Sequence, residues 1–98
     1  MRRIIRADGS ELPLDRVPTM REVESMIGAA TLDTVSLRHL DGPLQVMLLD
    51  DAGHSKGLPI NLAATKLYWA RCGRQVDHVI RGDVVIVFDD DYAPKGTP

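Results

Sequence analysis

The pattern of apolar and polar positions predicts one clear helix early in the chain. Thr19 is placed as its N-cap, and Glu22 follows three residues later, which is the spacing of a capping box. Gly28 supplies the left-handed residue that ends the helix. The apolar side chains recur at helical intervals and form one face, made of Met20, Val23, Met26 and Ile27.

Two segments in the middle of the chain predict an antiparallel hairpin. Residues 31–40 alternate apolar and polar positions, with Val35 and Leu37 on the apolar side. Residues 44–49 are more uniformly apolar, so we expect this strand at the centre of a sheet, covered on both faces. Residues 41–43, Asp-Gly-Pro, form the turn between them.

Three further segments have the character of short strands. Residues 3–7 are β-prone and end at an Asp-Gly turn. Residues 11–14 can form a short edge segment, because Pro13 cannot donate a hydrogen bond to a neighbouring strand. Residues 84–88 are apolar throughout and predict the last strand.

A second helix is predicted after Pro59, beginning near Ile60 or Asn61 and ending at Gly73. The order of the elements indicates an α+β fold, with a mainly antiparallel sheet of about four strands and two helices packed on it. We expect residues 1–92 to form a single domain and residues 93–98 to form a flexible tail. The order of the strands cannot be read from this pattern.

Composition and charge narrow the classes of function. The chain has 98 residues and a formal net charge of −2, so it lacks the basic footprint of a nucleic-acid-binding domain. A cluster of Arg2, Arg3 and Arg6 keeps a DNA-binding regulator as an alternative. No apolar run approaches the roughly 20 residues of a membrane span. With Cys72 as the single cysteine, we expect a cytoplasmic protein without a membrane partner.

The turn before the second helix is the candidate ligand-binding site. Glycines allow close backbone approach, a lysine adds positive charge, and the start of a helix presents free N–H groups. The spacing matches neither the P-loop nor the dinucleotide fingerprint, so a plain connecting loop is the alternative. The residues of this candidate nucleotide or phosphate site are Gly53, His54, Ser55, Lys56, Gly57 and Asn61.

The sequence contains no pattern that predicts catalysis, a metal site or a cofactor. His39, His54 and His78 lack the spacing that places metal ligands on one helical face. Cys72 lies near a helix C-terminus, where the helix dipole does not favour a thiolate. We therefore expect a protein that is not an enzyme and that needs no cofactor.

Two further groups of side chains are candidates for binding a protein partner. Tyr68 and Trp69 are adjacent on a helix and point in different directions, so at least one should be partly exposed. The aspartates after the last strand can form a local acidic patch. The predicted partner-binding residues are Tyr68, Trp69, Arg71, Asp89, Asp90 and Asp91.

Four motifs between residues 20 and 88 carry a resemblance to a known family. They lie at residues 26–29 (Met-Ile-Gly-Ala), 46–53, 57–65 (Gly-Leu-Pro-Ile-Asn-Leu-Ala-Ala-Thr) and 80–87 (Ile-Arg-Gly-Asp-Val-Val-Ile-Val). In this order the chain resembles a small family of domains of unknown function carried mainly on phage and plasmid genomes. The resemblance implies an accessory protein of a mobile element without an assigned reaction.

The leading interpretation is a non-enzymatic protein that binds and modulates a host or element-encoded protein. One form of it is an inhibitor of a bacterial defence system, of the anti-CRISPR or antirestriction type, by analogy with other short accessory proteins. The alternatives are the nucleotide or phosphate binder and the DNA-binding regulator. We also expect a homodimer, because residues 3–6 or residues 84–88 could lie at an unpaired sheet edge.

Overall fold

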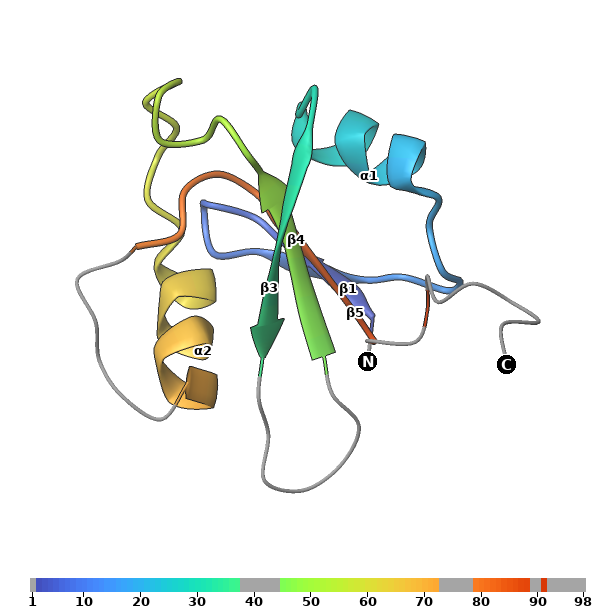
Figure 1. Cartoon of the computed structure of the whole chain (residues 1–98). Coiled ribbons are helices and arrows are strands. Elements are labelled where there is room, and N and C mark those ends of the chain that lie inside the picture. Colours follow the sequence, from blue (N-terminus) through green and yellow to red (C-terminus); the bar gives the residue numbers. More distant parts are fainter. Residues whose placement is uncertain (1, 38–44, 73–78, 89–90, 92–98) are drawn as a thin grey trace.

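The structure is a computed structural model that describes residues 2–37, 45–72, 79–88 and 91. They form one five-stranded antiparallel sheet, in the order β2-β1-β5-β4-β3, with two helices (Figure 1). The predicted α+β fold is confirmed, with slightly more strands than expected because the segment containing Pro13 also pairs. The elements are β1 (Arg3–Ile5), β2 (Glu11–Pro13), α1 (Met20–Ile27), β3 (Leu32–Leu37), β4 (Gln45–Asp50), α2 (Leu62–Cys72) and β5 (Val84–Phe88).

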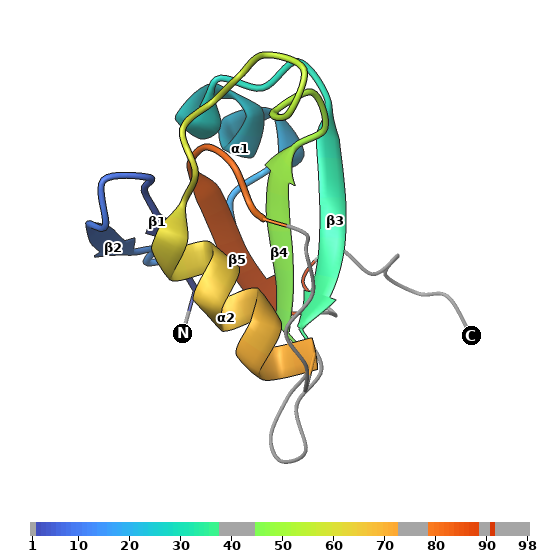
Figure 2. The ribbon, with the colours of Figure 1, turned by 90° about the vertical axis from the view of Figure 1, so that its left-hand side faces the viewer.

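The first and last strands of the chain lie side by side inside the sheet. Ile4 of β1 is opposite Val85 of β5 on one side and opposite Leu12 of β2 on the other. The prediction that residues 3–6 or residues 84–88 form a sheet edge is therefore wrong. β1 and β5 each have two neighbours, and the edges of the sheet are β2 and β3 (Figure 2).

The two helices cover opposite faces of this sheet (Figure 1). Successive strand residues point to opposite faces, so Ile4 packs with α1 whereas Ile5 packs with α2. The first four residues of β5 are all buried, because this strand is covered on both sides. The central position expected for residues 44–49 is confirmed from residue 45 onward, since β4 lies between β5 and β3.

Local sequence signals determine both ends of α1 as predicted. Thr19 accepts a hydrogen bond from the Glu22 N–H at 3.1 Å, and the Glu22 carboxylate accepts one from the Thr19 N–H at 2.8 Å. Gly28 ends the helix with φ of 69°, in the left-handed region that favours glycine. Helix α2 begins at Leu62, close to the predicted start near Ile60 or Asn61. Its predicted end, Gly73, lies outside the described residues.

Helix α2 begins immediately after a buried asparagine. Asn61 is fully buried, and its Oδ1 accepts a hydrogen bond from the Ala64 N–H at 3.0 Å in the manner of an N-cap. Its Nδ2 donates to the Ile5 carbonyl at 3.0 Å and to the Gly82 carbonyl at 2.9 Å. One side chain therefore joins the start of α2 to the end of β1 and to the segment that enters β5.

Thr65 extends this buried network along α2. Its hydroxyl donates to the Asn61 carbonyl at 2.8 Å and accepts from the Ile80 N–H at 2.9 Å. The Asn61 N–H in turn donates to the Ile80 carbonyl at 2.8 Å. The first turn of α2 is thus attached to residues 80–82 by hydrogen bonds that satisfy buried polar groups on both segments.

We expect Asn61→Ala to lower the free energy of unfolding by about 3 kcal/mol, because it removes three buried hydrogen bonds, two to carbonyls and one from an N–H. Asn61→Asp preserves the size but can donate to the carbonyls only when protonated. Its folded-state pKa should therefore be raised, and the destabilisation should grow as the pH rises above roughly 4.

Urea unfolding at several pH values measures both effects, with Ser25→Ala on the exposed side of α1 as the control. A loss below about 1 kcal/mol for Asn61→Ala, the value of a single ordinary hydrogen bond, would contradict a central role for this side chain.

Candidate functional site

A hollow of about 300 Å³ opens where β4 ends and β3 begins. It lies on the face of the sheet that α2 covers, because Leu49 in its lining belongs to the core beneath that helix. Charged side chains from both strands and from the following loops surround this apolar residue. The lining consists of Asp33, Leu49, Asp50, Asp51, Gly53, His54, Val79 and Arg81.

The structure places the predicted ligand-binding residues in three different settings. Gly53 and His54 line the hollow. Ser55, Lys56 and Gly57 lie on the exposed turn that follows. Asn61 lies just before α2 and is fully buried.

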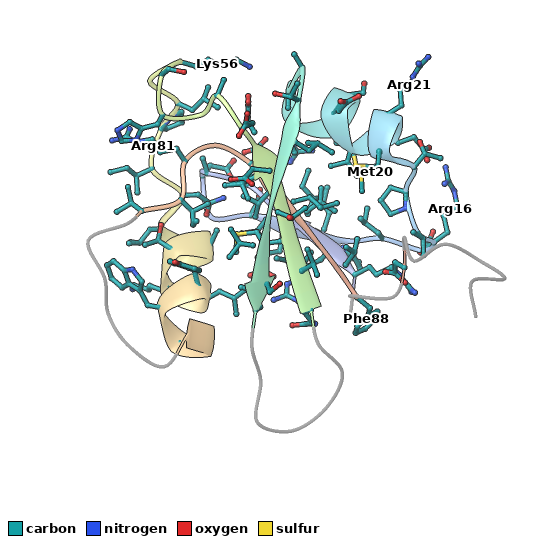
Figure 3. The ribbon with its side chains drawn as sticks, in the orientation of Figure 1. Arg16, Met20, Arg21, Lys56, Arg81 and Phe88 are labelled. Carbon is teal, nitrogen blue, oxygen red and sulfur yellow. The ribbon has the colours of Figure 1, made fainter. Side chains whose placement is uncertain are left out.

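Lys56, which is labelled in Figure 3, lies on this turn and forms hydrogen bonds within the protein. Its ammonium donates to Asp50 Oδ2 at 2.7 Å and to the Gly28 carbonyl at 3.2 Å, where α1 ends. Burial raises the pKa of Asp50, but the hydrogen bonds from Lys56 and from the Ala52 N–H outweigh it, so this pKa lies below its usual range. Lys56 therefore fastens the turn to α1 and compensates the negative end of its dipole.

These contacts occupy the groups on which the anion-binding hypothesis depends. Asn61 uses its side chain on the backbone of three other segments, which gives it a structural role in place of the predicted ligand contact. An N–H of the first turn of α2 is bound by Asn61, and the Lys56 ammonium is bound by Asp50. A nucleotide or phosphate site at this turn stays a prediction that these contacts do not favour.

Two aspartates and one arginine are the remaining charged groups described in the hollow, and they differ in their contacts. Asp33 and Asp51 are exposed, and neither forms an ion pair with another residue in the described ranges. Arg81 donates from Nη1 to the Leu58 carbonyl at 3.0 Å, and its buried Nε has no hydrogen-bond partner in the described part of the chain. The hollow therefore presents two exposed carboxylates beside an anchored guanidinium.

The arginines near the start of the chain are paired with acidic side chains. Arg2 donates two hydrogen bonds to Asp91, which hold the pKa of that carboxyl below its usual range and leave its side chain 5% exposed. Asp91 is thus part of the fold, while Asp89 and Asp90 lie outside the described residues. Paired cations have less to contribute to phosphate binding. The pairs are Arg2–Asp91, Arg3–Glu11 and Arg6–Asp83.

The aromatic residues proposed for partner binding lie on α2. Tyr68 and Trp69 are both half-buried, and Tyr68 packs against the core between α2 and the sheet. Each has an interaction partner within the protein. Arg71 belongs to the same helix, and its side chain lies outside the described part. The partner-binding role of these residues stays a prediction.

The outer side of β3 is a feature that the sequence did not indicate. β3 has six residues and lies at the edge of the sheet, where no described strand pairs with its outer side (Figure 2). The opposite edge, β2, has three residues and includes Pro13, which cannot donate to a further strand. The two edges are therefore unequal, and β3 is the one that another strand can join.

The pairing of β3 with β4 determines which backbone groups face outward. The Asp51 N–H donates to the Thr31 carbonyl at 3.1 Å, so the backbone groups of Thr31 face β4. In an antiparallel pair, every second residue directs its N–H and C=O groups to the same neighbour, so the backbone groups of residues 33, 35 and 37 also face β4. The Thr34 N–H instead donates to the carboxylate of the neighbouring Asp33 at 2.9 Å, which agrees with this alternation. The outward N–H and C=O groups belong to Leu32, Thr34 and Ser36.

Comparisons with known proteins do not assign the chain to a family. A scan against family models, a search of curated proteins and a search of solved structures each return no match. The resemblance to a phage and plasmid family therefore stays a prediction. Within residues 2–37, 45–72, 79–88 and 91, no helix is long and apolar enough to cross a membrane, and no cluster of His, Cys, Asp and Glu could hold a metal ion.

We expect Lys56→Met to destabilise the protein by about 2 kcal/mol near neutral pH, because it leaves the buried Asp50 carboxylate without its cation. With Lys56, the lowered pKa of Asp50 contributes stability above the unfolded pKa, and this is lost as the pH falls through the folded value. Without Lys56, burial should raise that pKa, so the difference between variant and wild type should shrink towards acid pH.

Thermal unfolding between acid and neutral pH measures this difference, and Lys66→Met on the exposed side of α2 is the matched control. Equal destabilisation at all pH values would show that the ion pair is not its cause.

Proposed function

We propose that this chain is a non-enzymatic protein-binding module that engages its partner by strand addition at β3. The observation that carries this proposal is the six-residue edge strand without a paired neighbour in the described structure. In strand addition, an extended peptide uses main-chain hydrogen bonds for affinity and alternate side chains for specificity. The outward groups of Leu32, Thr34 and Ser36 supply the main-chain partners for such a peptide.

The sheet supports β3 as a rigid template for this pairing. β3 pairs with β4 over all six of its residues, and β4 pairs with the buried strand β5. A partner strand would therefore extend an existing sheet and would not have to order a flexible segment of this chain, which lowers the entropic cost of binding.

The polar groups near this edge have structural tasks, which supports the expectation of a non-enzymatic protein. Ser55 donates its hydroxyl to the Ala52 carbonyl at 3.2 Å, and it is not directed to His54 as a nucleophile would be. Lys56 is bound to Asp50. Ser55 and Lys56 thus use their polar groups within the fold, which favours a binding role over a reaction.

The biological setting that we propose follows from the resemblance to phage and plasmid proteins. A cytoplasmic accessory protein of a mobile element would bind a host or element-encoded protein, and a component of a bacterial defence system is one such target. Self-association through β3 is a second use of the same edge, since residues 3–6 and 84–88 lie inside the sheet. A dimer would occupy the surface that the partner needs.

We expect Thr34→Pro to abolish partner binding while the protein stays folded. The Thr34 N–H faces outward and bonds only to the adjacent Asp33 carboxylate, so proline removes no hydrogen bond to β4 but blocks a further strand. Thr34→Val, which retains the N–H, is the matched control.

A photo-crosslinking amino acid at Ser36 measures binding in host cells, with the same group at Lys66, on the exposed side of α2, as the reference. We expect one partner to crosslink from position 36 in the wild type and in Thr34→Val, and not in Thr34→Pro. Crosslinking that survives Thr34→Pro, or that is as strong from position 66, would contradict binding at β3. Light scattering of the same variants tests whether that partner is a second copy of the chain.

A further inference from the structure

The two sides of β3 lead to two hollows of different chemistry. Along the strand, Leu32, Thr34 and Ser36 lie on the face covered by α1, because they are opposite Asp50, Leu48 and Val46. The alternate residues lie on the face covered by α2, opposite Leu49, Met47 and Gln45. A strand added to β3 would continue the pleat and would direct its alternate side chains to these same two faces.

On the α2 face, the side chains of an added strand would meet an acidic rim. Asp33 belongs to β3 itself, and Asp51 follows β4 on the same face and lines the same hollow of about 300 Å³. Among the described residues, neither is in an ion pair. Asp50 is neutralised by Lys56, and Arg81 is anchored to the Leu58 carbonyl. The charge that a partner strand meets first on this side is therefore negative.

On the α1 face, the side chains of an added strand would meet a hollow whose described lining carries no charged side chain. Helix α1 lies at the end of the sheet where β3 begins (Figure 1). A hollow of about 220 Å³ is lined by residues of both elements. Val46, Leu48 and Val87 form apolar lining, and Met20 at the start of α1 is 41% exposed. Thr34 and Ser36 line it from β3 with short side chains, which leave room for longer apolar groups from a neighbouring strand.

From these two hollows we infer that the strand accepted by β3 alternates basic and apolar side chains. Its lysine or arginine residues lie beside Asp33 and Asp51, and its apolar residues lie over Thr34 and Ser36 towards Val46. Opposite charges directly across a strand pair stabilise it, and like charges destabilise it. This inference rests on the proposed strand addition and names the chemistry of the partner.

A second copy of the chain matches this description poorly. β3 carries one charged residue, Asp33, and no basic residue. Antiparallel pairing of two copies of β3 would therefore bring two negative charges to the same face without a cation between them. The charge pattern favours a different protein as the occupant of this edge.

Synthetic peptides of about nine residues, long enough for one strand, test this inference by fluorescence anisotropy. One peptide alternates lysine and leucine, a second alternates glutamate and leucine, and a third has the composition of the first in two blocks. We expect the alternating lysine peptide to bind about tenfold more tightly than the glutamate peptide. This preference should shrink at roughly 0.5 M salt, where exposed charges are screened.

Variants of the protein locate the effect. Asp33→Asn retains the acceptor for the Thr34 N–H and removes only the charge, so it should reduce the preference for lysine, and Asp33→Asn with Asp51→Asn should reduce it further. Asp15→Asn, an exposed acidic residue away from β3, is the control and should change nothing. Thr34→Pro should abolish binding of every peptide. NMR shifts on binding should concentrate in β3 and in the lining of the two hollows.

The outcomes separate this inference from the proposed function. If the lysine and glutamate peptides bind equally, and both shift the NMR signals of β3, the charge assignment is overturned. Strand addition at β3 is then still supported. Binding of the block peptide as tightly as the alternating one would overturn the assignment of the two faces. Failure of all peptides to bind would overturn the inference, while crosslinking from Ser36 would still decide the proposed function.

Discussion

The hydrogen bonds of Asn61 hold together segments that are far apart in the sequence. The same side chain contacts the carbonyls of Ile5 and Gly82 and the N–H of Ala64, and it is fully buried. β1 ends at Ile5 and β5 begins just after Gly82, so their antiparallel pairing and the start of α2 meet at one point. A buried amide is costly unless its partners are present, and here that cost enforces a single arrangement of the three elements.

The arrangement around Asn61 determines which edges the sheet exposes. Because β1 and β5 pair, the first strand of the chain occupies the interior, and the short β2 segment is left on one side. The β3–β4 hairpin joins the sheet through β4, whose last four residues are buried, so β3 is left on the other side. Which two strands lie at the edges is therefore a consequence of how the ends of the chain pair.

Elements that depend on neighbouring residues could be predicted from the sequence, and those that depend on distant ones could not. The capping box of Thr19 and Glu22, the stop at Gly28 and the apolar strand at residues 44–49 all follow from local signals. The pairing of β1 with β5 joins positions about 80 residues apart, and no local pattern specifies such a contact. An asparagine three residues before Ala64 is a capping signal, but its two contacts with distant carbonyls leave no trace in the sequence.

The candidate site shows the same division. A glycine-rich turn with a lysine before a helix suggests an anion site, and the turn is where it was expected. The meaning of Lys56 depends on Asp50 being buried beside it, and that burial comes from the packing of β4. Likewise, Arg2 is paired with Asp91, which follows β5, and Arg6 is paired with Asp83, which precedes it. Charge along the chain therefore indicated the type of side chain at the site but not its partner.

The contact between Asp33 and Thr34 bears directly on the strand addition that we propose at β3. In the free protein, the Asp33 carboxylate accepts a hydrogen bond from the one outward N–H at the middle of β3. An added strand that uses this N–H has to displace the carboxylate, and the charge then needs a new partner. A strand that brings a basic side chain supplies one at the moment of displacement, whereas a neutral or acidic strand does not. In the strand addition that we propose, the same residue thus protects the edge against indiscriminate pairing and favours a partner strand with basic side chains.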